Sequence, residues 1–270
     1  MQDVIPRVSQ ESEEREGFSF LTPLGAHYDH ITIEAPTDPL SIREAFKDRP
    51  ELRKILNIAK EFKEKHPKTF NGKLLGRPKF SFEKDGSLTI KAEQLHYFVY
   101  FAAHELLHGT TREEYAALSV CGTIFDPEAQ QFLMSVRPQD SQEDPGKIDA
   151  PGGTLNPDAI EQADPLATIR NRFEEKLGIS ETKPVCIGIE RIFDEQYSLY
   201  NLAFYTEQTC SQSAAPQDSY AKIPLAAVDE YLQDSARMTT PARATLLLAL
   251  SQPTFTSKGW GPEKVNSLLK

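Results

Sequence analysis

Apolar positions recur along the chain with two periodicities, and each periodicity predicts a different kind of secondary-structure element. The helical periodicity covers residues 41–65, where apolar side chains recur every three or four positions and would share one face of a helix. Ser41 and Glu44 form a capping-box pair at the start of this segment. Pro50 removes a backbone donor inside it, so we expect two helical pieces.

The strand periodicity is found in the next part of the chain, where it predicts two hairpins. The first spans residues 79–90 and turns at the Lys-Asp-Gly of residues 84–86. The second spans residues 116–137 and turns near the Asp-Pro of residues 126–127. Both hairpins are expected to contribute antiparallel strands to one sheet.

Helices and strands then follow one another without strict alternation. Helical patterns cover residues 165–177, 228–232 and 242–250, while apolar strand patterns cover residues 185–190 and part of 197–206. Strands before, between and after a few helices favour an α/β fold with a mixed sheet and helices on its faces.

Composition narrows the class of protein and of ligand. The 270 residues, 39% apolar and 26% charged, fit a globular protein that buries a full core. A formal charge of -10 disfavours non-specific binding to nucleic acid or an anionic membrane, so a phosphate ligand would need a local basic pocket. Three widely spaced cysteines and the absence of a leader-like or membrane-spanning run predict free thiols and a cytoplasmic protein. Acidic residues 1–17 are expected to form a loose arm.

A glycine pair followed by a helix carries the strongest functional signal. Gly152 and Gly153 end a strand-like run, and the later helix closes on Glu-Glu-Lys-Leu-Gly-Ile. This order resembles the box of the Nudix hydrolase family, Gly-x5-Glu-x7-Arg-Glu-Φ-x-Glu-Glu-x-Gly-Φ, where Φ is aliphatic. Gly153 matches the first glycine of the box and Gly178 the last. With Glu161 as the first acid, each spacer is two residues longer than in the family.

Pieces outside the box resemble one branch of that family, the UDP-sugar pyrophosphatase-like Nudix proteins. They include the Asn-Gly-Lys-Leu of residues 71–74 and the Pro-Gly of residues 145–146. The resemblance implies an α/β/α sandwich around a mixed sheet, with an N-terminal helical and β extension. We therefore expect an arm and helical extension over residues 1–67. Residues 68–270 would form the Nudix-like domain, including its N-terminal β hairpin.

The box departs from the family where magnesium would bind. The family's carboxylates at i, i+3 and i+4 share one helix face and can share a metal. Here those positions are Arg172, Glu175 and Lys176, so the box is degenerate. Each cation opposes nearby metal by about 1–4 kcal/mol, so magnesium binding by Glu175 and Glu161 is expected to be weakened. A register shifted by one residue would match Arg170 to the family's arginine and place the closing glycine one residue late.

The same cations can replace the charge of the metal. Arg172 and Lys176 would hold a diphosphate directly, and Glu175 would be the remaining acid of this predicted catalytic set. The glycine pair would let the backbone approach the ligand, and Arg137, at a strand end, would be a phosphate contact. The alternative is a solvated helix with surface ion pairs, such as Arg172 with Glu175, and no active site.

A second motif, His-Glu-Leu-Leu-His at residues 104–108, predicts different chemistry. His104 and His108 at i and i+4 of a helix can bind zinc while the intervening glutamate acts as a base, as in zinc metalloproteases. Gly109 would end the helix directly afterwards, and no third ligand follows. A histidine pair with ordinary packing is the competing interpretation.

Taken together, these patterns favour a Nudix-fold protein that binds a diphosphate-linked small molecule, such as a nucleotide sugar, with altered metal dependence. The sequence leaves open whether the molecule is also hydrolysed or rearranged. Two alternatives stay open: a non-catalytic Nudix-fold binding module, and a zinc-dependent hydrolase built on His104 and His108. Magnesium-dependent turnover would separate the first two, and stoichiometric zinc would support the third.

Overall fold

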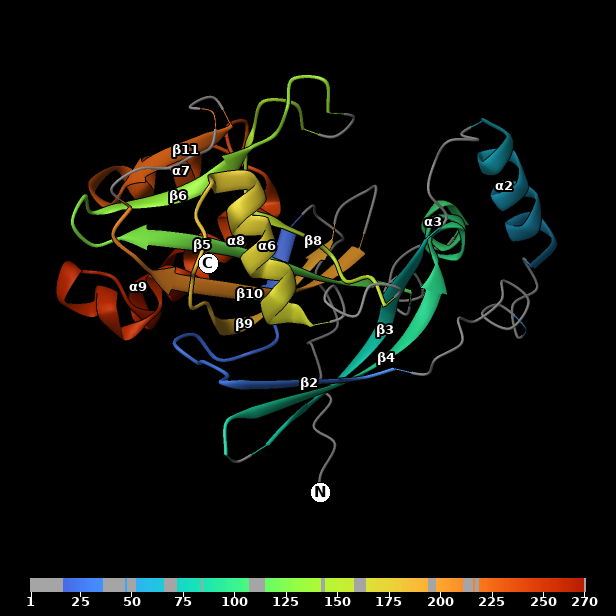
Figure 1. The fold of residues 1–270 in the computed structure, drawn as a ribbon, viewed down its shortest axis with the longest axis horizontal. Helices are drawn as coiled ribbons and strands as arrows, with labels where there is room; N and C mark the ends of the chain where they lie inside the picture. The colour runs from blue at the N-terminus through green and yellow to red at the C-terminus, as the bar shows by residue number, and fades with distance from the viewer. Residues whose placement is uncertain are drawn as a thin grey trace.

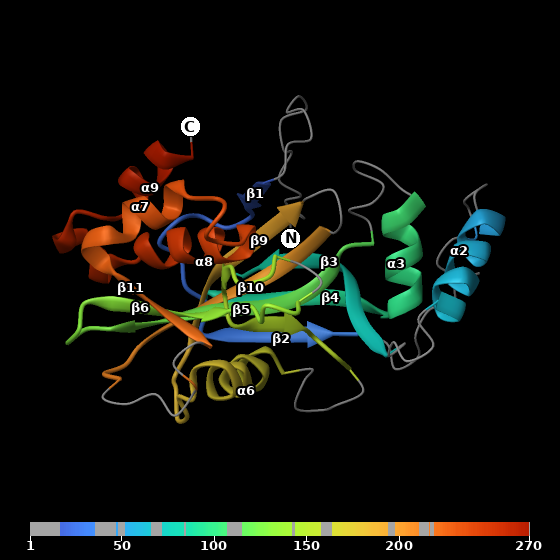
Figure 2. The same cartoon turned by 90° about the horizontal axis from the view of Figure 1, so that it is seen from above.

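A computed structural model describes most of the chain. The described residues are 17–35, 47, 52–65, 72–83, 85–106, 115–141, 144–157, 164–193, 198–210, 216 and 219–269. Within them the chain forms one mixed sheet with helices on both faces (Figures 1 and 2). The predicted α/β/α arrangement is therefore confirmed.

Eleven strands make up the sheet in the part of the chain that the structure describes. They are β1 (Gly17–Phe20), β2 (His30–Glu34), β3 (Lys73–Phe82), β4 (Ser87–His96), β5 (Ala117–Asp126), β6 (Gln131–Val136), β7 (Ile148–Asp149), β8 (Gly152–Thr154), β9 (Val185–Phe193), β10 (Ser198–Glu207) and β11 (Tyr220–Pro224). The main path runs β1-β9-β10-β5-β3-β4-β2, while β8 pairs with β5, and β6 pairs with β5, β7 and β11. The pairs β10–β5 and β2–β4 are parallel and the other named pairs are antiparallel.

Helices cover the two faces and one end of this sheet. They are α2 (Leu52–Lys65), α3 (Tyr97–Leu106), α6 (Pro165–Leu177), α7 (Val228–Gln233), α8 (Thr240–Leu250) and α9 (Pro262–Leu268), with the 3-10 turns η1 (Leu225–Ala227) and η2 (Pro253–Lys258). Figure 2 shows α6 on one face, α7, α8 and α9 on the other, and the α2–α3 pair at the end of the sheet. No helix among the described residues is long and apolar enough to cross a membrane.

Helix α6 docks because one of its faces is apolar. Ile169, Phe173 and Leu177 return at helical spacing and are fully buried against the sheet. Gly122 of β5 provides the room, since a Cβ atom there would lie 2.8 Å from the Phe173 ring. On the opposite face, α8 is buried along almost its whole length between the sheet and α9.

Both predicted hairpins form, as β3–β4 and β5–β6, and β4 extends six residues beyond the predicted end at Ile90, to His96. The second piece of the predicted N-terminal helix is α2, while most of its first piece lies outside the described residues. Strands β1 and β2, which the sequence patterns missed, join the main sheet beside β9 and β4. The division of the chain into two parts at residue 67 stays a prediction. Both strands precede residue 67, yet they pair with strands that follow it.

We predict that Phe173→Ala lowers the free energy of unfolding by about 3–5 kcal/mol, because it leaves a cavity under α6. Phe82→Ala is the matched control, since that ring is 40% exposed at the end of β3. Urea unfolding of the three proteins measures the difference. If Phe173→Ala lowers the free energy of unfolding no more than Phe82→Ala does, α6 does not depend on this contact.

Candidate functional site

The glycine pair lies on β8, a short strand that pairs with the central strand β5. Gly152 is opposite Cys121 and Gly153 is opposite Val120. A Cβ atom on Gly152 would lie 2.3 Å from the Val120 carbonyl oxygen, so only glycine fits there. This glycine is therefore explained by sheet packing alone, whatever ligand the site holds.

Local signals fix both ends of α6, so its outer face is held in a defined orientation. Asp164 caps the start, where its side chain accepts a hydrogen bond of 2.9 Å from the Leu166 amide, and Pro165 occupies the first turn. Gly178 ends the helix in a left-handed conformation with φ of 66°. The predicted helix over residues 165–177 is thus confirmed at both ends.

Arg172 connects this helix to the glycine strand. A Cβ atom on Gly153 would lie 3.1 Å from two nitrogens of the Arg172 guanidinium, so the missing side chain leaves space for the cation. The same guanidinium donates a 2.6 Å hydrogen bond to Glu175 Oε2. Lys176, one turn beyond Arg172, is exposed and forms no ion pair with any described residue. The Arg172 guanidinium therefore lies against Gly153 and pairs with Glu175, while Glu161 lies outside the described residues. The binding and catalytic roles expected of these residues stay predictions.

The described carboxylates of this region do not form a metal site as they stand. In the described part of the chain, no three His, Cys, Asp or Glu side chains are grouped closely enough to hold a metal ion. Glu175 already accepts from a cation, and the adjacent Glu174 is exposed. The donors around Arg172 thus do not fit a magnesium cluster, and weakened magnesium binding that includes Glu161 stays a prediction.

Arg137, the other predicted phosphate contact, belongs to a network centred on Asp149. Its Nε donates to Asp149 Oδ2 at 2.8 Å, and both side chains are mostly buried. Asp149 Oδ1 accepts from the Thr239 hydroxyl at 2.6 Å, and the Ser135 hydroxyl donates to the Asp149 carbonyl. The end of β6, strand β7 and the residue before α8 are therefore joined just before the glycine pair.

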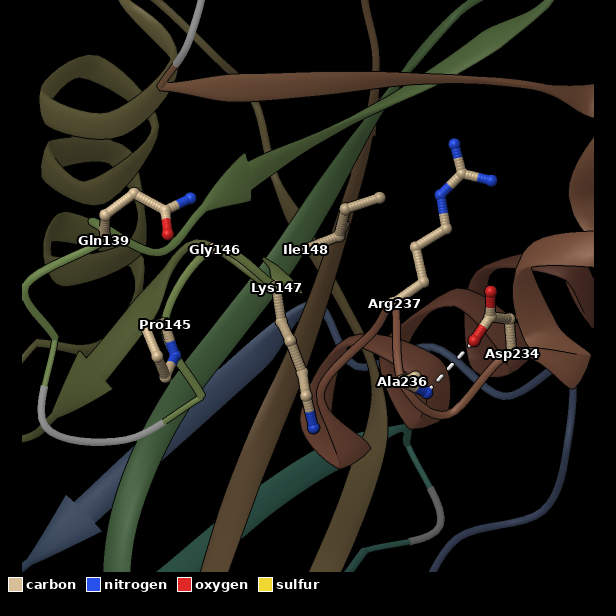
Figure 3. A pocket seen from close by; sticks show the side chains of 8 residues that line it. All are labelled: Gln139, Pro145, Gly146, Lys147, Ile148, Asp234, Ala236 and Arg237. Carbon is tan, nitrogen blue, oxygen red and sulfur yellow. Dashed lines mark hydrogen bonds between the residues drawn. The ribbon is translucent and has the colours of Figure 1, made fainter.

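A shallow pocket of about 460 Å³ lies next to this network (Figure 3). One wall is formed by Gln139 and residues 145–148, and the other by residues of the turn before α8. Its two cations are engaged: Lys147 pairs with Asp144 at 2.6 Å, and Arg237 lies 4.0 Å from the centre of the Tyr231 ring. In the figure the side chains of Lys147 and Arg237 extend in opposite directions. The pocket thus has no converging pair of cations for a phosphate.

The zinc motif is only partly within the described residues. His104 lies on α3, where it is buried and packs 4.2 Å from the Tyr100 ring, measured between centroids. His108 lies outside the described residues, so the pair itself stays a prediction. The position of His104 is that of a histidine packed in the core.

Sequence patterns did not reveal the roles of Asp149 and Thr239. Asp149 directly precedes the Ala-Pro-Gly-Gly run, and Thr239 precedes the Thr-Pro that opens α8. An N-cap threonine before Thr-Pro is a recognisable local signal. Its partner, 90 positions away, could be found only from the fold.

Comparisons with known proteins find likeness in structure alone. No protein-family profile and no curated protein matches the sequence. A MutT/Nudix family protein from Listeria innocua is 16% identical with a TM-score of 0.40, covering 53% of this chain and 95% of that one. A MutT protein from Methanosarcina mazei is 20% identical with a TM-score of 0.38, covering 53% and 94%. A Nudix hydrolase from Nitrosomonas europaea is 16% identical with a TM-score of 0.37, covering 50% and 88%. These likenesses carry no residue role over to this chain.

We predict that Thr239→Ala lowers the free energy of unfolding by about 2–3 kcal/mol, because it removes both the N-cap of α8 and a hydrogen bond to a charged group. The matched control is Thr254→Ala, which removes an exposed 2.6 Å hydrogen bond from a threonine to Glu207. The control should change the urea midpoint little. Equal effects would mean that the Asp149 network adds no stability.

Metal analysis tests the zinc motif. We expect well under one zinc per purified chain, because the motif lacks a third ligand. The double change His104→Ala with His108→Ala should leave the zinc content unaltered. Stoichiometric zinc that disappears in this variant would establish the zinc site instead.

Proposed function

We propose that this chain is a cytoplasmic Nudix-fold protein that binds a diphosphate-linked small molecule, such as a nucleotide sugar, without requiring magnesium. The observation that carries the proposal is the position of Arg172. Its guanidinium lies against Gly153 of the glycine strand, and the Arg172 side chain is still 32% exposed, so a ligand can reach it. An arginine held in this way presents several N–H donors in one plane, which suits phosphate oxygens.

The charge of the helix face supports an anionic ligand. Arg172 and Lys176 contribute two positive charges and Glu175 one negative charge, so the face is basic although the chain as a whole carries -10. The binding site is therefore local, as the composition requires for a phosphate ligand. Nucleic acid and membrane surfaces are not proposed as partners.

Phosphate can displace Glu175 from Arg172 at small cost. The side chain of Glu175 is 56% exposed, and an ion pair on a helix surface contributes about 0–1 kcal/mol. A hydrogen bond to a charged group is worth about 1.5–3 kcal/mol, and a diphosphate offers several acceptors. The ion pair thus positions Arg172 in the free protein and yields when a ligand arrives.

The proposal concerns binding first. Hydrolysis or rearrangement of the bound molecule would need an acid–base group beside the phosphate. Glu175 is the candidate, because it is the carboxylate in direct contact with Arg172. A turnover assay with and without magnesium would decide between an enzyme and a binding module.

We predict that calorimetric titration with UDP-glucose, in the presence of a chelator, gives measurable binding to the wild type. Arg172→Ala should weaken that binding by about 1.5–3 kcal/mol. Arg170→Ala, also on α6 but two positions away and exposed, should leave it unchanged. If Arg170→Ala weakens binding and Arg172→Ala does not, the shifted register is the correct one. If neither variant changes the affinity, the face is solvated surface and the site lies elsewhere.

The sign of the charge provides a second test of the same face. The double change Arg172→Glu with Lys176→Glu would build an acidic i, i+3, i+4 face around Glu175. We expect metal-free binding to be lost and magnesium affinity, followed by calorimetry, to rise. Unaltered magnesium affinity would contradict the idea that these cations take the place of the metal.

A further inference from the structure

A carboxylic acid is buried in the interface between α8 and the sheet, on the face opposite α6. Glu190 of β9 is 0% exposed. Its neighbours come from three other elements: Cys121 of β5, Asn201 of β10 and Thr245 of α8, all nearly or fully buried. The Cys121 thiol lies 3.5 Å and the Asn201 amide nitrogen 3.4 Å from Glu190 Oε2. Cys121 also contacts the Thr245 hydroxyl at 3.1 Å.

This cluster has hydrogen-bonding groups but no positive charge. The groups that face Glu190 are the thiol of Cys121, the amide of Asn201 and the hydroxyl of Thr245, and its register partner on β1 is Phe20. Glu190 Oε1 has no hydrogen-bond partner among the described residues. An ionised carboxylate would thus be placed in an apolar interface with few donors and no counter-ion.

We propose that Glu190 is a proton-dependent latch that holds α8 on the sheet. In the closed state the side chain is a neutral carboxylic acid. When the O–H bond is broken, the proton passes to a base in solvent and the electron pair stays on the carboxylate. The resulting buried charge weakens the packing of α8, because the cluster offers it neutral hydrogen-bonding groups but no positive charge.

The latch is connected to the candidate site through the start of α8. Thr239 caps that helix and donates to Asp149, which lies three residues before Gly152. Loosening α8 would therefore release one of the two described side chains that donate to the Asp149 carboxylate. The latch rests on its own geometry, so it stands or falls separately from the proposed ligand.

The direction of the pH effect follows from burial. Desolvation raises the pKa of Glu190 from 4.5 to about 8, although contacts with Thr245, Asn201 and Cys121 oppose the shift. Burial also raises the pKa of the Cys121 thiol, so both groups are neutral at pH 7. Between about pH 4.5 and 8 the unfolded chain has lost the Glu190 proton while the folded chain keeps it. Stability from this group is therefore full below pH 4.5, falls through this window and levels off above it.

Urea unfolding between pH 5 and 9 tests the latch with Glu190→Gln, which keeps the shape of a neutral acid and cannot ionise. Relative to this variant, the unfolding equilibrium constant of the wild type should rise up to about tenfold per pH unit until about pH 8. Glu230→Gln, at an exposed position of α7, is the matched control and should follow the wild type. The same pH dependence in Glu190→Gln and wild type would overturn the proposal.

Two further measurements keep the proposal testable if Glu190→Gln does not fold. Thr245→Val removes a hydroxyl that favours the ionised form, so the decline in stability should extend to higher pH. Hydrogen exchange of the wild type should show α8 amides losing protection, relative to α6 amides, from pH 6 to pH 9 after correction for intrinsic rates. An unmoved pH profile in Thr245→Val, or equal losses in α6 and α8, would contradict a latch at α8.

Discussion

The constraint on which the rest of the structure depends is the complete burial of β5. Every residue of this strand is buried, because α6 covers one face and α8 the other, while β10, β3, β6 and β8 occupy its edges. A strand enclosed on all sides allows little variation in side-chain volume. Gly122 admits the Phe173 ring, and Gly152 admits the Val120 carbonyl, each at a distance that a Cβ atom would not allow.

This constraint changes how the glycine pair is understood. The sequence offered one explanation for both glycines, close approach of the backbone to a ligand. The structure gives each a separate partner within the protein, the β5 backbone for Gly152 and the Arg172 guanidinium for Gly153. The second contact is the one on which the proposed ligand site rests, because it holds a cation beside the glycine strand.

Local features could be predicted from the sequence, and contacts between distant segments could not. Both ends of α6 follow from Asp164, Pro165 and Gly178, which act within one turn of the helix. The Arg172–Glu175 pair also follows from i, i+3 spacing, and the sequence named it as one alternative. By contrast, β1 and β2 have short, partly exposed patterns that resemble loops until their partners are known. The clusters around Asp149 and Glu190 include contacts between residues 69, 90 and 124 positions apart, and a periodic sequence pattern does not predict such contacts.

The pairing of β1 with β9 has a consequence for how the chain is made. Gly17 is opposite Phe193, so β1 cannot pair until more than two thirds of the chain has been synthesised. At a synthesis rate of about 5–20 residues per second, the N-terminal strand is without its partner for on the order of ten seconds. Long-range pairing of this kind also slows folding, because the entropy cost of closing the loop comes before the stabilising contacts form. During that interval the apolar rings of Phe18 and Phe20 lack the β9 strand beside which they lie in the folded protein, so β1 stays open to other partners until β9 has been made.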